Sequence, residues 1–138
     1  MRILITNLLS LLIILIPFGL VAGPAIPDIV VSVSSTIFIF FLLINKKIDY
    51  FNNKIFIYFL LFCFYLLTLS FFSIDPNLSF ESSLFYFRFG VFTLLFLYIL
   101  ENDKKFLSKL FFSLLILFIL LFFDSMIQFI YKKNLLGF

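Results

Sequence analysis

Long uncharged apolar runs constrain this chain more than any other feature. The runs 3–21 and 55–72 contain no charged residue. A helix of about 20 apolar residues crosses the roughly 30 Å hydrocarbon layer of a bilayer. Only 12% of the 138 residues are charged, against about 25% in soluble domains, and a soluble domain of this size could not cover so much apolar surface. We therefore predict an integral membrane protein, and exclude soluble enzymes and nucleic-acid-binding proteins.

The apolar runs predict an all-α fold with about five transmembrane helices. The predicted spans are 3–21, 29–45, 55–72, 80–100 and 106–123. They take up roughly 100 positions, so residues 1–138 form a single polytopic membrane domain with short loops. The segments 23–28 and 73–79 are predicted to be two of these loops, the second because of its Asp75-Pro76-Asn77 turn signal.

The distribution of basic residues predicts the orientation in the membrane. With the N-terminus in the cytoplasm, most basic residues outside the spans fall on the cytoplasmic side, and two fall on the other side. The cytoplasmic group is Arg2, Lys46, Lys47, Lys54, Lys104, Lys105 and Lys109, and the opposite pair is Lys132 and Lys133. Because cytoplasmic loops carry the excess of Lys and Arg, we expect a cytoplasmic N-terminus and a C-terminus on the outer side.

Several common chemistries are missing from the sequence. It contains no His, and its one Cys, Cys63, lies inside an apolar run. His is the usual general base and metal ligand near neutral pH, and a lone Cys cannot form a disulfide framework. Gly-rich phosphate loops and metal-ligand spacings are also absent. We therefore predict no catalytic residues, no metal and no cofactor.

Arg88 is the most informative polar residue, because it lies inside the fourth predicted span. An unpaired Arg in hydrocarbon is costly, so its side chain should face the helix bundle or a wet cavity. One interpretation is an ion pair with Glu81, Asp124 or Asp28 that fixes helix packing. The other is an anion site, in which the guanidinium grips a phosphate through paired hydrogen bonds. The residues alone leave both open.

Asp124 and Gln128 form a second polar pair, four residues apart at the end of the fifth predicted span. They share one face if the helix continues past Phe123. They are either an ordinary helix end at the membrane surface or the polar rim of a cavity that accepts a headgroup or sugar.

Asp28 and the hydroxyl residues that follow it have simpler interpretations. An acidic residue at the start of the second span can cap the free amides of the helix. The cluster Ser32, Ser34, Ser35 and Thr36 is expected to support close helix packing.

Three segments together resemble the O-antigen ligase/polymerase family. They are Gly23-Pro24-Ala25-Ile26-Pro27-Asp28, Phe85-Tyr86-Phe87-Arg88-Phe89, and the ending with Asp124, Gln128 and Asn134-Leu135-Leu136-Gly137-Phe138. The ending departs from the family pattern, because Lys132 stands where a Gly is common.

The resemblance implies a multi-pass protein of the bacterial inner membrane that transfers or polymerises glycan carried on undecaprenyl diphosphate, as in lipopolysaccharide biosynthesis. It covers only about the first third of such a protein, so we interpret the chain as an N-terminal portion without the catalytic loop. Arg88, Asp124 and Gln128 would then bind the lipid diphosphate or glycan. The alternatives are a small non-enzymatic membrane subunit, partnered with other membrane subunits, or part of a transporter or flippase.

Overall fold

The computed structural model describes residues 2–132, and every regular element in that range is a helix. The elements are α1 (Arg2–Ala22), α2 (Ala25–Ile44), the short 3-10 helix η1 (Ile48–Asn52), α3 (Lys54–Ser70), α4 (Pro76–Phe85), α5 (Phe87–Asn102) and α6 (Phe106–Tyr131). The predicted all-α class is confirmed for the described residues.

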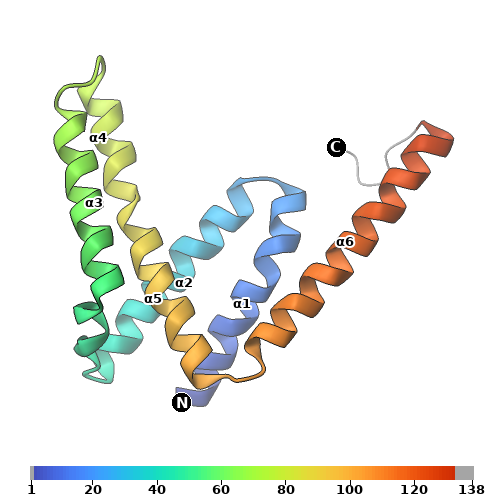
Figure 1. Cartoon of the computed structure of the whole chain (residues 1–138), viewed down its shortest axis with the longest axis horizontal. Coiled ribbons are helices and arrows are strands. Elements are labelled where there is room, and N and C mark those ends of the chain that lie inside the picture. Colours follow the sequence, from blue (N-terminus) through green and yellow to red (C-terminus); the bar gives the residue numbers. More distant parts are fainter. Residues whose placement is uncertain (1, 133–138) are drawn as a thin grey trace.

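The helices run back and forth between two ends of the molecule (Figure 1). The N-terminus, the 45–53 segment and the 103–105 turn lie at the lower end in that view. The α1–α2 turn, the α3–α4 turn and the end of α6 lie at the upper end. This alternation is the one expected of a chain that crosses a membrane repeatedly.

Within residues 2–132, four helical stretches are long and apolar enough to cross a membrane. They are Leu4–Ala22, Ala25–Ile44, Pro76–Asn102 and Phe106–Ile130. Helix α3, which covers most of the third predicted span, is a shorter apolar helix of 17 residues. At about 1.5 Å per residue, α3 is about 26 Å long, at the lower limit for a helix that crosses the hydrocarbon layer. The membrane class stands, with four spans of sufficient length and one shorter apolar helix.

Both predicted outer loops turn out to be largely helical. The second span begins at Ala25 instead of residue 29, and Pro27 lies in its first turn. The fourth begins at Pro76, after Asp75, whose side chain accepts a hydrogen bond from the Leu78 amide. Proline is tolerated in a first helical turn, because the amides there have no acceptor within the helix. The Gly-Pro and Asp-Pro signals therefore mark helix starts, where we had predicted loops.

The core lies between α1, α2 and α5, and α3 and α6 add one side chain each. Its largest fully buried side chain is Tyr98, which is 1% exposed and contacts the rings of Phe38 and Phe41 at 5.4 Å between centroids. Close approach of α3 to α5 depends on Gly90, where an added Cβ would lie 2.5 Å from a ring carbon of Phe59. The absence of a side chain at Gly90 therefore lets α3 approach α5 closely. The core comprises Leu9, Ile13, Phe38, Phe41, Leu42, Phe56, Val91, Leu94, Leu95, Tyr98, Ile99 and Phe106.

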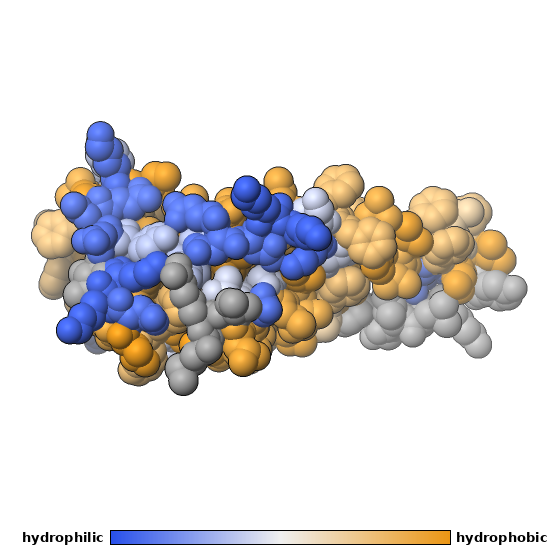
Figure 2. Space-filling view, turned by 90° about the horizontal axis from the view of Figure 1, so that it is seen from below, coloured by the Kyte–Doolittle hydropathy of each residue, from blue (hydrophilic) through white to orange (hydrophobic). Residues whose placement is uncertain are grey.

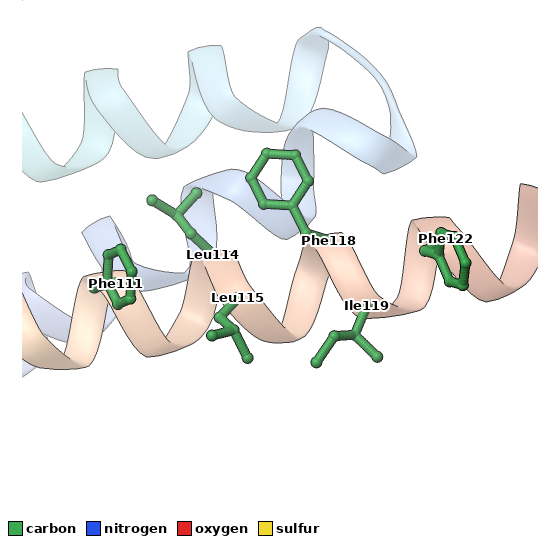
Figure 3. A pocket seen from close by; sticks show the side chains of 6 residues that line it. All are labelled: Phe111, Leu114, Leu115, Phe118, Ile119 and Phe122. Atoms are coloured by element: carbon green, nitrogen blue, oxygen red, sulfur yellow. The ribbon is translucent and has the colours of Figure 1, made fainter.

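Helix α6 diverges from the other helices toward its C-terminal end (Figure 1). Its first half packs on α1, where the Ser113 hydroxyl donates to the Ile14 carbonyl at 2.8 Å. Figure 3 shows Leu114 and Phe118 on one side of α6, and Leu115 and Ile119 on the other. The shallow apolar pocket on this helix, of about 550 Å³, is lined by Phe111, Leu114, Leu115, Phe118, Ile119 and Phe122. Such a face suits the acyl chains of lipids or the apolar side of another helix.

Candidate ligand-binding cleft around Arg88

The fourth predicted span is interrupted at Tyr86, between α4 and α5. The Tyr86 amide donates to the Ser83 carbonyl and the Phe89 amide donates to the Tyr86 carbonyl, both across three residues. Hydrogen bonds of this spacing tighten the helix locally. The interruption therefore places Arg88 in the first turn of a new helix, where its side chain leaves the helix beside α2.

The Arg88 guanidinium binds one turn of α2. Its Nη2 lies 2.5 Å from Oδ1 of Asp28, and its Nη1 donates to Oγ of Ser32 at 2.9 Å. Asp28 and Ser32 are four residues apart and so lie on the same helix face. The Ser32 hydroxyl also donates to the Asp28 carbonyl at 2.8 Å, which fixes its orientation toward Arg88. Arg88 thus joins the start of α5 to the start of α2.

A second contact and two aromatic rings complete the surroundings of Arg88. The buried Ser35 hydroxyl donates to the Arg88 carbonyl at 3.1 Å. The guanidinium carbon lies 5.1 Å from the ring centre of Phe89 and 5.8 Å from that of Phe85, within the range of cation–π attraction. The Nε atom is buried and has no hydrogen-bond partner in the described structure. Nη1 and Nη2 each carry two N–H groups, so each keeps one further donor besides its bond to Ser32 or Asp28.

An open cleft of about 550 Å³ lies beside this ion pair. Its lining residues are Asp28, Ser82, Phe85, Tyr86, Arg88 and Phe89. The side chains of Arg88 and Asp28 keep 26% and 48% of their surface exposed, so a ligand can reach both. A guanidinium, a carboxylate and flanking aromatic rings can bind a ligand that carries anionic groups or hydroxyls next to an apolar part.

The structure distinguishes among the partners predicted for Arg88. Its ion pair within the described residues is with Asp28, and not with Glu81 or Asp124. Glu81 is exposed and lies on α4, beyond the interruption at Tyr86. We had interpreted Asp28 mainly as a helix cap, but α2 begins three residues earlier, at Ala25, and its Pro24 cap makes no side-chain hydrogen bond. The four-residue spacing of Asp28 and Ser32 was the sequence signal for this site.

Asp124 and Gln128 do share a helix face, because α6 continues to Tyr131. The Gln128 Nε2 donates to Oδ2 of Asp124 at 2.7 Å, whereas Oδ1 of Asp124 is buried and unpartnered within the described residues. The pair lies on the end of α6 that diverges from the other helices, on the opposite side of Figure 1 from α4. The structure therefore does not bring Asp124 and Gln128 together with Arg88.

Comparison with family models, with curated proteins and with solved structures finds no match to this chain.

Proposed function

We propose that this chain is the N-terminal membrane portion of an O-antigen ligase-like protein of the bacterial inner membrane. In this proposal the protein transfers or polymerises undecaprenyl-diphosphate-linked glycan during synthesis of cell-surface polysaccharide such as lipopolysaccharide. Residues of the chain bind the lipid-linked glycan and do not themselves break or form bonds. The proposal joins the resemblance of three sequence segments to one structural observation, the accessible guanidinium in the aromatic cleft.

The position of the cleft supports a ligand that enters from the outer side of the membrane. Asp28 lies in the first turn of α2, close to the upper end of Figure 1, where the α1–α2 turn lies. With a cytoplasmic N-terminus, as the basic residues favour, this end faces the periplasm. There the exposed part of the Arg88 guanidinium would bind the diphosphate, and the rings of Phe85, Tyr86 and Phe89 would contact sugar or prenyl carbons.

A non-enzymatic subunit is the second candidate, and α6 favours it. The side chains of this helix are mostly exposed beyond its contact with α1. The buried and unpartnered Oδ1 of Asp124 could accept a hydrogen bond from a neighbouring helix, because polar side chains join helices within membranes. A non-enzymatic subunit would not need to bind a ligand in the Arg88 cleft.

Photo-crosslinking from the cleft tests the proposed function. In bacteria that make undecaprenyl-diphosphate-linked glycan, Tyr86 is replaced by the photoreactive residue p-benzoylphenylalanine. We expect a crosslink to the lipid-linked glycan that disappears when Arg88→Ala is added. The matched control carries the same photoreactive residue at Tyr58, which is 70% exposed on α3 and should crosslink only to bulk lipid. Equal glycan capture from both positions would contradict the proposal.

A further inference from the structure

A second charged surface lies at the opposite end of the molecule from the Arg88 cleft. We call it the lysine-rich end and define it by Lys46, Lys47, Lys54, Lys104, Lys105 and Lys109. Figure 2, seen from below, shows hydrophilic side chains gathered over this end. The six lysines come from two segments that are about 50 residues apart in the sequence, 46–54 and 104–109.

Aromatic contacts hold the first of these segments against the end of α5. The Tyr50 hydroxyl donates to a carboxylate oxygen of Glu101 at 2.8 Å, and its ring lies 5.5 Å from that of Tyr98. The Lys47 ammonium lies 5.9 Å from the centre of the Tyr98 ring. Burial and the hydrogen bond to Glu101 raise the pKa of Tyr50 to about 12, so its phenol stays protonated as a donor. The two lysine segments therefore share one surface.

Two of the three acidic residues at this end, Asp103 and Glu101, are engaged with other groups, whereas Asp49 is exposed and makes no ion pair within the described residues. Asp103 accepts a hydrogen bond from the Lys109 ammonium at 2.8 Å and one from the Lys105 amide at 2.9 Å. The hydrogen bond from Lys109 lowers the pKa of Asp103, which keeps it ionised and paired. Glu101 accepts from Tyr50. Among the described residues of this end, the exposed lysines that make no ion pair are Lys46, Lys54, Lys104 and Lys105.

Exposed apolar side chains lie directly beside these lysines. Ile44 is 76% exposed, Ile55 is 56% exposed and Leu107 is 61% exposed. Each is within three residues of a lysine of the surface. A soluble phosphate compound would use only the ammonium groups, whereas a phospholipid would also cover the apolar side chains with its acyl chains. Anionic headgroups at a membrane surface attract lysines in this position.

We propose that the lysine-rich end binds anionic phospholipid headgroups, with the phosphates on the lysines and the acyl chains along Ile44, Ile55 and Leu107. The proposal is independent of the function proposed for the Arg88 cleft. Bound lipid would also stabilise the packing of η1 on the end of α5.

Lipid-dependent stabilisation of the full chain tests this proposal. The purified protein in a neutral detergent is titrated with phosphatidylglycerol, with phosphatidylcholine of the same acyl chains, and with glycerol phosphate. We expect phosphatidylglycerol to raise the midpoint of thermal unfolding by a few degrees, because a ligand that binds only the folded state stabilises it. Phosphatidylcholine and glycerol phosphate should raise it much less.

Variants that neutralise lysines test whether the stabilisation by phosphatidylglycerol comes from the lysine-rich end. The double substitution Lys104→Gln and Lys105→Gln should at least halve the shift, while the midpoint without lipid should change little because both side chains are exposed. A second double variant, Lys46→Gln with Lys54→Gln, should reduce the lipid-dependent shift in the same way. The control pair, Lys132→Gln with Lys133→Gln, removes the same charge after α6 and should keep the full shift. An equal shift with phosphatidylcholine or glycerol phosphate, or an undiminished shift in the two variants, would overturn the proposal.

Discussion

Replacing Arg88 by Ala is expected to weaken ligand capture in the cleft by roughly 10- to 100-fold, because a hydrogen bond to a charged group contributes about 1.5–3 kcal/mol. The same substitution should cost only about 1 kcal/mol of stability, since exposed ion pairs contribute little and the Asp28 carboxylate is 48% exposed. Capture is measured as photo-crosslinking yield from position 86, and stability as the free energy of unfolding in detergent. Insertion and abundance should stay near those of the unsubstituted chain.

Two companion substitutions separate ligand binding from helix packing. Asp28→Asn removes the carboxylate charge but leaves the guanidinium, so capture of an anionic ligand should persist or increase. The exchange Arg88→Asp with Asp28→Arg restores the ion pair between α2 and α5 in reverse, and should recover stability. If Arg88→Ala and Asp28→Asn instead reduce stability and capture in parallel, then Arg88 serves helix packing alone.

Tyr98→Ala should be the most destabilising single substitution among the aromatic residues of the core. The side chain is 1% exposed and its ring contacts those of Phe38, Phe41 and Tyr50. Deleting a buried aromatic side chain typically costs about 3–5 kcal/mol, because the cavity left behind closes only in part. The free energy of unfolding, followed by helical circular dichroism during denaturant titration of detergent-solubilised protein, measures this loss.

Two control variants interpret the Tyr98 result. Tyr58→Ala makes the same chemical change on a side chain that is 70% exposed, and should change stability by less than about 0.5 kcal/mol. Tyr98→Phe keeps the ring and should lose much less than Tyr98→Ala. Equal losses at positions 98 and 58 would show that α2, α5 and η1 do not meet around Tyr98 in the membrane protein.

Apolar run length was enough to predict the membrane class and the approximate helices, because crossing hydrocarbon requires long uncharged segments. The cost of a charge in such a segment was also enough to single out Arg88 and to place Asp28 among its candidate partners. The sequence therefore identified Arg88 and Asp28, two of the residues that line the cleft, without its geometry.

Helix packing and the interruption at Tyr86 could not be predicted in this way. Helices that are apolar on every side give no periodic signal for the face that packs. The sequence therefore could not predict that α6 diverges from the other helices or that Asp124 lies far from Arg88. The interruption between α4 and α5 falls at Tyr86, and neither neighbour of Tyr86 is a Pro or a Gly that would predict a break in the helix. The helix starts at Ala25 and Pro76 were misplaced because Pro ends a helix in one context and begins it in another.

Sided labelling of single cysteines is the most direct test of the central claim, that the Arg88 cleft opens toward the outer side of the membrane. In a Cys63→Ser background, Ser82→Cys lines the cleft and Asn53→Cys lies next to the lysine-rich end. A membrane-impermeant maleimide is added to spheroplasts before and after permeabilisation. We predict that Ser82→Cys reacts in sealed spheroplasts and that Asn53→Cys reacts only after permeabilisation. Reaction of Asn53→Cys in sealed spheroplasts, with Ser82→Cys protected until permeabilisation, would contradict the account.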